Sequence, residues 1–229
     1  MIKAIFFDID DTLYNSSDLA HHARMNAILA MIDSGLSEKD PKKAYAKLKG
    51  IVAKYGSNYP HHLDRLLEEL GTPYNPAIIA AGVAAYHDTK LSFIRPFPET
   101  IPTLLKLRDL GYSLGVISEG LPVKQWEKLI RLGLTHFFKK VIISDSVGAD
   151  KSSKLLYEIA LKNMGCEPYE AVMVGDKPDR DIETAKSVGL HTVLVSKSRK
   201  KTNADFTIKR LVDLLVVIAK IEKKRDAKA

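Results

Sequence analysis

The sequence predicts an α/β fold in which a parallel sheet carries an inserted all-helical domain. Three observations support this. Five short apolar runs rich in β-branched residues have the near-continuous hydrophobicity of parallel strands covered on both faces: Ala4–Phe7, Ser113–Ile117, Lys140–Ser144, Ala171–Val174 and Thr192–Val195. Helical patterns alternate with the later runs, which predicts right-handed crossovers between parallel strands. Between the first and second runs lies a long segment with no strand-like pattern.

The core is predicted to begin with the first apolar run and to resume near Pro96. Its last apolar piece, Ala204–Ile208, leads into a helix from Lys209 to about Lys220. The helical patterns between the later strands are Pro122–Arg131, Ser153–Met164 and Asp179–Val188. We therefore predict a Rossmann-like core made of residues 1–14 and 96–229.

Residues 15–95 are predicted to form a separate helical domain. The turn-forming stretches "YGSNYP" and "GTPYNP" divide this segment. Its helical patterns are Asp18–Ser34, Asp40–Lys54, His61–Leu70 and Pro76–Lys90. A domain inserted after the first strand leaves the sheet at the carboxyl ends of the strands, where open α/β sheets bind their ligands. This position predicts a cap domain.

Composition is that of an ordinary globular protein. The 229 residues are 45% apolar and 28% charged, enough for a sizeable core. No apolar run approaches the roughly 20 residues of a membrane-spanning helix. Asp8 and Asp10 interrupt the early apolar run, which argues against a signal peptide. We expect a cytoplasmic protein without a membrane partner, and the single Cys166 allows no intrachain disulfide.

The formal net charge of +7 raises the question of a nucleic-acid partner. Basic residues gather in Lys197–Lys201 and in the tail Lys220–Ala229, and no aromatic residues are interleaved with them. This pattern favours solvated surface, so no nucleic acid is expected. The charge remains compatible with small anionic partners. A monomer or a homodimer is expected.

Polar residues follow the predicted strands at the points where they end. Asp8 follows the first strand, Ser118 ends the second and Asp176 follows the fourth. Lys151 comes a few residues after the third strand. Because the carboxyl ends of parallel strands share one edge of a sheet, these four side chains are predicted to converge on one cleft.

The acidic residues of this cleft call for a cation. Asp8, Asp10 and Asp11 lie within four positions, and Asp176 joins them from another strand. Such a group cannot ionise at low cost beside a single lysine. A site with oxygen ligands and no histidine or cysteine suits Mg²⁺. The sequence therefore predicts a magnesium site.

Two stretches and two single residues resemble the four motifs of the haloacid dehalogenase superfamily, and they occur in the same order as in the superfamily. They are "DIDDT" (Asp8–Thr12), Ser118, Lys151 and "GDKPDRD" (Gly175–Asp181). The inserted domain resembles a C1-type cap. The stretches "YGSNYPHH", "AYHDTK" and "LPVKQWEK" are closer still to archaeal phosphatases of this superfamily that are named for glyceraldehyde 3-phosphate.

The resemblance implies hydrolysis of a small phosphomonoester, such as a sugar or triose phosphate, through an aspartyl-phosphate. Asp8 would be the nucleophile, and Asp10 would protonate the leaving group and then activate water. Mg²⁺ would be held by the Asp8 side chain, the Asp10 carbonyl and the Asp176 carboxylate. Lys151 would offset negative charge on Asp8 and on the phosphate.

Further residues have supporting roles in this scheme. Ser118 and the amides of Glu119 and Gly120 would hold phosphoryl oxygens. Asp181 would support the metal site through water or Lys151, and Thr12 would support the loop by hydrogen bonding. Two positions depart from the family pattern: Glu119 replaces a usual Asn or Asp, and Ser152 replaces a usual Pro.

Other functions remain open. The dehalogenases of the superfamily lack an acid two residues after the nucleophile, so Asp10 favours phosphoryl chemistry. The nearest alternative is a sugar phosphomutase or another phosphotransferase that shares the intermediate. A different class is a non-catalytic protein that binds phosphate or, through its basic tail, nucleic acid. The structural alternative is a loop that merely binds a cation.

Several residues are assigned structural roles. Asp11 is interpreted as a capping or surface residue, and Asp179 as the cap of the helix that follows it. Trp126 is interpreted as a packing residue. His61 and His62 are not predicted to bind a metal, because adjacent residues on a helix point apart.

Overall fold

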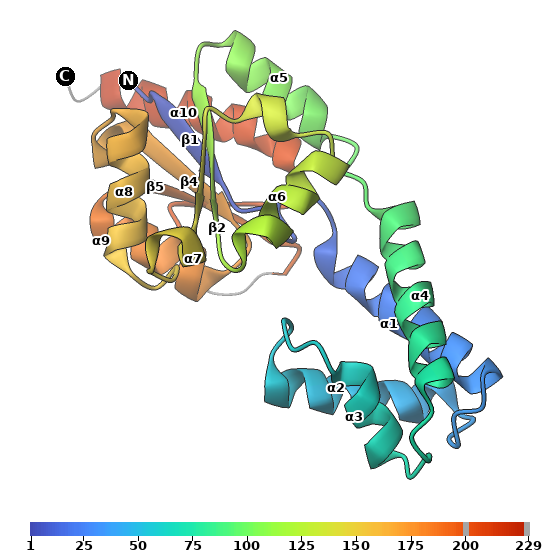
Figure 1. The fold of residues 1–229 in the computed structure, drawn as a ribbon. Coiled ribbons are helices and arrows are strands. Elements are labelled where there is room, and N and C mark those ends of the chain that lie inside the picture. Colours follow the sequence, from blue (N-terminus) through green and yellow to red (C-terminus); the bar gives the residue numbers. More distant parts are fainter. Residues whose placement is uncertain (199–201, 227–229) are drawn as a thin grey trace. The chain divides into compact units, whose positions relative to one another are not determined.

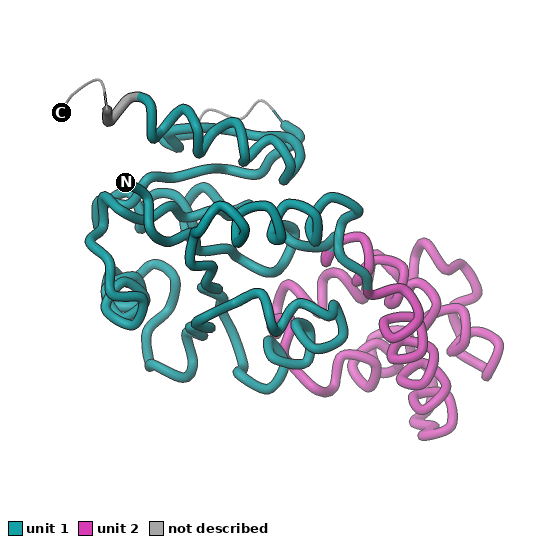
Figure 2. The backbone as a smooth tube through the Cα atoms, turned by 90° about the horizontal axis from the view of Figure 1, so that it is seen from above, with its two compact units in different colours: residues 1–15, 95–229 teal, residues 16–94 magenta. Residues whose placement is uncertain are grey.

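The computed structural model describes residues 1–198 and 202–226. The chain forms two compact units, one made of Met1–Asn15 with Arg95–Ala229 and the other of Ser16–Ile94 (Figure 2). Residues 199–201 and 227–229 of the two basic segments lie outside the described residues. Among the described helices, none combines the length and the apolarity needed to cross a membrane.

The first unit is built on a parallel sheet, as the sequence predicts. The strand order is β3-β2-β1-β4-β5-β6, and all described pairs are parallel. The strands are β1 (Ala4–Phe7), β2 (Ser113–Ser118), β3 (Lys140–Ile143), β4 (Ala171–Gly175), β5 (His191–Val195) and β6 (Phe206–Ile208). β1 is buried along its whole length because both of its edges are paired and both of its faces are covered.

Helices cover the two faces of this sheet (Figure 1). α8 (Lys154–Met164) and α9 (Thr184–Val188) lie on one face, where their apolar side chains pack with Phe6 of β1. α5 (Thr100–Asp109) packs against β2 and against α10 (Leu214–Asp226) on the other face. Gly115 permits close packing on the α8 face, since a Cβ there would lie 2.8 Å from the ring of Phe6.

The remaining elements complete the first unit. They are α6 (Pro122–Arg131), α7 (Ser144–Val147), the 3₁₀ turns η1 (Thr135–Phe137), η2 (Pro168–Glu170) and η4 (Leu211–Asp213), and the π-helical turn η3 (Pro178–Glu183). The helix predicted over Asp179–Val188 is therefore η3 followed by α9.

Two structural assignments from the sequence are wrong. Asp179 does not cap a helix, because η3 begins one residue earlier and places Asp179 inside the first turn. Trp126 is not a packing residue, since it is 41% exposed on α6, whereas Gln125 and Leu129 form the buried side of that helix.

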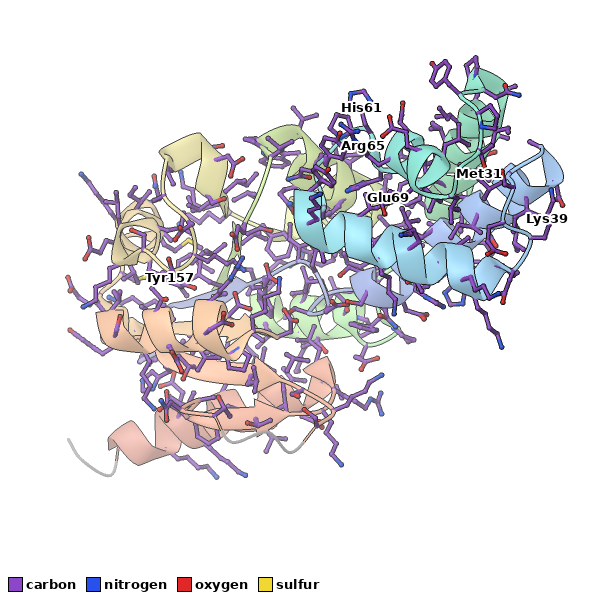
Figure 3. All side chains as sticks on the ribbon, turned by 90° about the horizontal axis from the view of Figure 1, so that it is seen from below. Met31, Lys39, His61, Arg65, Glu69 and Tyr157 are labelled. Atoms are coloured by element: carbon purple, nitrogen blue, oxygen red, sulfur yellow. The ribbon has the colours of Figure 1, made fainter. Side chains whose placement is uncertain are left out.

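The second unit consists of four helices with their own apolar core. They are α1 (Ser16–Asp33), α2 (Pro41–Tyr55), α3 (His62–Glu69) and α4 (Pro76–Phe93). Asp40 and Asn75 cap α2 and α4 through their side-chain oxygens, which accept hydrogen bonds from backbone N–H groups. α1 and α4 pack closely at Gly82, where a Cβ would lie 2.7 Å from the Met31 side chain (Met31 is labelled in Figure 3).

Candidate active site

The candidate site lies where the order of the strands changes direction. From β1 the chain proceeds outward through β2 and β3, and then returns to place β4 on the other side of β1. The carboxyl ends of strands at such a point form the usual ligand crevice of an open α/β sheet. Asp8 follows β1 directly, and its N–H donates to the carbonyl of Val174 in β4 at 2.9 Å.

A buried lysine joins two aspartates at this edge. Lys151 Nζ donates to Asp8 Oδ1 at 2.5 Å and to Asp181 Oδ1 at 2.6 Å. The side chains of all three residues are at most 4% exposed. The charge of the lysine makes burial of the two carboxylates possible, because ionised groups are rarely buried without a partner of opposite charge.

Asp176 adds a third carboxylate to those of Asp8 and Asp181. Oxygens of Asp8, Asp176 and Asp181 lie within 4.8 Å of one another. Asp176 Oδ1 is buried and accepts no hydrogen bond from any described residue. A buried oxygen without a donor is unusual in a folded protein, and three carboxylates exceed the charge of one lysine. This donor set fits a hard cation that prefers oxygen ligands.

The path of the chain after β4 brings Asp181 into the cluster. Gly175 has no side chain, and a Cβ there would lie 2.4 Å from the Asp181 carboxyl group. The N–H of Lys177 donates to Asp181 Oδ2 at 3.0 Å. The buried Tyr157 (labelled in Figure 3) donates its hydroxyl hydrogen to the carbonyl of Arg180 at 2.8 Å and so helps to hold η3.

The electrostatics of the cluster reflect burial and crowding. Burial raises the pKa of Asp8 to about 6, with Lys151 acting in the opposite direction. Burial, with the nearby charges of Asp8 and Asp181, raises the pKa of Asp176 to about 7. Burial alone would lower the pKa of Lys151, but the two aspartates outweigh it and raise that pKa. Lys151 therefore stays charged, whereas Asp8 and Asp176 resist ionisation.

Replacing Asp176 with asparagine is expected to change the pH dependence of stability in the metal-free protein. Its pKa rises from 3.8 to about 7 on folding, so the folded chain holds this proton more tightly than the unfolded chain does. The protonated Asp176 therefore stabilises the folded state fully below its pKa in the unfolded chain, and this contribution is lost as the pH rises through its pKa in the folded chain. Asp176→Asn should therefore gain stability relative to the wild type as the pH rises from about 4 to about 7.

Denaturant unfolding with a chelator present measures this difference. Asp179→Asn is the matched control, because the Asp179 side chain is 76% exposed. The raised pKa of Asp176 would be contradicted if the stability of Asp176→Asn relative to the wild type stayed constant over this pH range or fell as the pH rose.

Asp10 occupies a different environment, although it lies two residues after Asp8. Lys128 Nζ donates to Asp10 Oδ2 at 2.6 Å, and the Tyr14 hydroxyl donates to Asp10 Oδ1 at 2.8 Å. Burial alone would raise the pKa of Asp10, but the charge and hydrogen bond of Lys128 and the Tyr14 hydrogen bond lower it below its ordinary range. The turn that follows Asp10 begins with Asp11 at a φ of 54°, a left-handed conformation that Asp adopts more readily than most residues.

The residues predicted to hold phosphoryl oxygens follow β2. The Ser118 hydroxyl is buried and donates to Gln125 Oε1 at 3.1 Å. The Gly120 N–H donates to the Ser144 hydroxyl oxygen at 2.9 Å, so a phosphoryl oxygen would have to replace that bond. Glu119, the departure noted in the sequence, pairs through its carboxylate with Arg180 Nη1 at 2.6 Å. The negative charge of Glu119 is therefore partly balanced by Arg180 of η3.

Two other positions singled out in the sequence have different outcomes. The Thr12 hydroxyl is buried and makes no hydrogen bond with any described residue, contrary to its predicted role. The loop is held instead by the Leu13 N–H, which donates to the carbonyl of Ile9 at 3.0 Å. At the second departure, the Ser152 N–H donates to Asp150 Oδ1 at 2.9 Å, which fixes the turn after Lys151 without the usual proline.

Sequence reasoning missed Gln125, Lys128 and Arg180. Arg180 lies within the stretch "GDKPDRD", whose charged residues offered a signal. Gln125 is the only glutamine of the chain, and Lys128 follows it at a helical spacing of three residues. This spacing places the two side chains on one side of a helix. The sequence does not show, however, that this side faces Ser118 and Asp10.

The comparisons with known proteins agree with this geometry. A family model described as haloacid dehalogenase-like hydrolase matches residues 2–189. A relative named glyceraldehyde 3-phosphate phosphatase, from Methanopyrus kandleri, is 45% identical over 97% of this chain and 100% of its own length. A relative of the same name from Pyrococcus abyssi is 50% identical over 84% of this chain and 81% of its own.

A solved structure titled as an HAD phosphatase, from Thermococcus onnurineus, is 27% identical with a TM-score of 0.65, and the match covers 95% of this chain and 98% of that one. These findings confirm the predicted fold class, the resemblance and the prediction of an enzyme. The chain belongs to the haloacid dehalogenase-like hydrolase family.

Proposed function

We propose that this chain hydrolyses a small phosphomonoester and that glyceraldehyde 3-phosphate is the leading candidate substrate. One observation carries the proposal: Asp8 is buried against Lys151, and an oxygen of Asp176 lies within 4.8 Å of it. Asp176 Oδ1 accepts no hydrogen bond from any described residue. The names of relatives at 45% and 50% identity support the substrate.

The proposed cofactor is Mg²⁺, held by the carboxylates of Asp8 and Asp176 and by the backbone carbonyl of Asp10. When bound, the ion neutralises charge on a phosphoryl group and orients it. Asp181 is proposed to support the site through Lys151, whose Nζ lies 2.6 Å from Asp181 Oδ1. The excess of carboxylates over cations in this cluster supports a divalent ion.

The proposed chemistry gives Asp8 and Asp10 different roles. Asp8 attacks phosphorus, the bond to the leaving oxygen breaks, and an aspartyl-phosphate forms. Asp10 donates a proton to the leaving alcohol and later removes one from the water that hydrolyses the intermediate. Lys151 offsets charge on Asp8 throughout, and Ser118 and the backbone amides of Glu119 and Gly120 hold the phosphoryl oxygens. The helical unit, residues 15–95 by the sequence prediction, is proposed to be a cap domain.

A panel of phosphorylated metabolites, assayed for phosphate release with Mg²⁺ and with a chelator, tests the proposal. We expect turnover of sugar or triose phosphates with Mg²⁺ and loss of most of it with the chelator. A 2-haloacid tested in parallel should release no halide. Transfer of the phosphoryl group to a sugar instead of water would select the phosphomutase alternative, and no turnover of any phosphomonoester would contradict the proposal.

A further inference from the structure

α6 presents two polar side chains to the candidate site. Gln125 is buried with 5% exposure, and the Lys128 side chain is 20% exposed. Both lie on the side of α6 that packs inward with Leu129, whereas Val123 and Trp126 are exposed. Holding an amide and an ammonium group in this position requires partners for both of them.

The partners come from two separate loops of the site. Gln125 Oε1 accepts hydrogen bonds from the Ser118 hydroxyl and from Lys128 Nζ, each at 3.1 Å. Gln125 Nε2 donates to the carbonyl of Glu119 at 2.9 Å. Lys128 Nζ continues the chain of contacts to Asp10 Oδ2 at 2.6 Å. One continuous network therefore runs from the loop after β2 through α6 to the loop after β1.

Asp10 and Gln125 are both constrained within this network. Asp10 has a donor on each oxygen, Lys128 on Oδ2 and Tyr14 on Oδ1, so its carboxylate cannot rotate without breaking a bond. Gln125 is confined on the other side, because a Cβ at Gly120 would lie 3.0 Å from Gln125 Nε2. The network is thus built to hold two groups in fixed orientations relative to each other.

We propose that Lys128 and Gln125 are positioning residues: Lys128 orients the Asp10 carboxylate for proton transfer to the leaving group, and Gln125 holds the Ser118 side chain beside the phosphoryl oxygens. This inference rests on the proposed function and extends it to a helix outside the four motifs. Proton transfer needs the acid within hydrogen-bond reach of the leaving oxygen, and a displacement of about 1 Å can reduce the rate about 100-fold. Neither residue touches the reacting atoms; each acts through Asp10 or Ser118.

Leaving groups of different acidity separate this role from others. An aryl phosphate has a good leaving group and needs little protonation, whereas an alkyl phosphate depends on the acid. Lys128→Met, which keeps the apolar stem, should lower kcat for the alkyl phosphate about 100-fold and for the aryl phosphate only a few-fold, with KM nearly unchanged. Loss of the Lys128 charge alone would raise the pKa of Asp10 and favour its protonated form, so this fall in rate reports the lost orientation of Asp10. Lys128→Arg should restore part of the loss. Gln125→Leu should raise KM for both substrates, because Ser118 loses its anchor.

Lys124→Met is the matched control, since it removes the same charge from an exposed position of α6 and should leave both rates unchanged. An equal loss on both substrates with a raised KM would assign Lys128 to substrate binding and would overturn the inference. An unchanged dependence on the leaving group would leave Lys128 only a structural role, and would overturn it too.

A crystal structure of Lys128→Met provides a readout that does not depend on turnover. The Asp10 carboxylate should adopt a new orientation there, and an unchanged Asp10 would contradict the positioning role. If the wild type hydrolysed no phosphomonoester, the proposed function would fail, and this structure would still decide whether Lys128 orients Asp10.

Discussion

Replacing Asp8 with asparagine is expected to lower the turnover of any phosphomonoester by at least about 10⁴-fold, because removal of a nucleophile abolishes the covalent route. The fold should persist. Without the Asp8 carboxylate, Lys151 still contacts Asp181 at 2.6 Å, so the buried lysine keeps a partner of opposite charge. The variant also removes a buried carboxyl group whose pKa is raised to about 6, which reduces crowding of negative charge in the cluster.

Phosphate release and circular dichroism measure the two parts of this prediction. Asp11→Asn is the matched control: it makes the same chemical change three residues later, at a φ of 54° that Asn tolerates well. That variant should keep its turnover. Substantial phosphatase activity in folded Asp8→Asn would refute the assignment of Asp8 as the nucleophile.

Replacing Lys151 with methionine is expected to reduce both activity and stability. Turnover should fall about 10³-fold, because the charge that offsets Asp8 and the phosphate is lost. Asp8 and Asp181 would then face each other without their shared lysine, with side chains no more than 4% exposed. Removing one partner of such a buried pair costs about 3 kcal/mol of unfolding free energy. Binding of Mg²⁺ should recover part of this loss, since a cation again balances the carboxylates.

Denaturant unfolding with chelator and with Mg²⁺ measures the stability change. Lys154→Met, at an exposed position of α8, controls for the general loss of a positive charge. If metal-free Lys151→Met were as stable as Lys154→Met, the account of the buried ion pair would be wrong.

The strand tips of the site could be predicted because their positions follow from regular geometry. Parallel strands align their carboxyl ends, so residues as far apart in sequence as Asp8 and Lys151, 143 positions, could be expected at one edge. The strands themselves were recognisable by their continuous apolar runs. In the structure, Asp8, Asp176, Asp181 and Lys151 lie together.

The parts that could not be predicted depend on how helices pack. Gln125 and Lys128 belong to the site only because α6 turns one particular side inward. The pairing of Glu119 with Arg180 joins two loops whose paths no periodic pattern describes. α5 was missed because it buries Thr100 and Thr103 beside its leucines, which weakens its apolar periodicity. β6 lies within the apolar piece Ala204–Ile208, but three residues are too short to show a strand pattern.

Rapid acid quenching of a reaction with labelled phosphomonoester tests the central claim most directly. The Asp10→Asn variant with an aryl phosphate is the combination of choice. The good leaving group needs little protonation, so Asp8 can still attack, whereas loss of the base should slow hydrolysis of the intermediate. Peptide mapping of the quenched protein should find the phosphoryl group on Asp8. A phosphoryl group on any other residue, or phosphate release with no labelled protein at any quench time, would contradict the account.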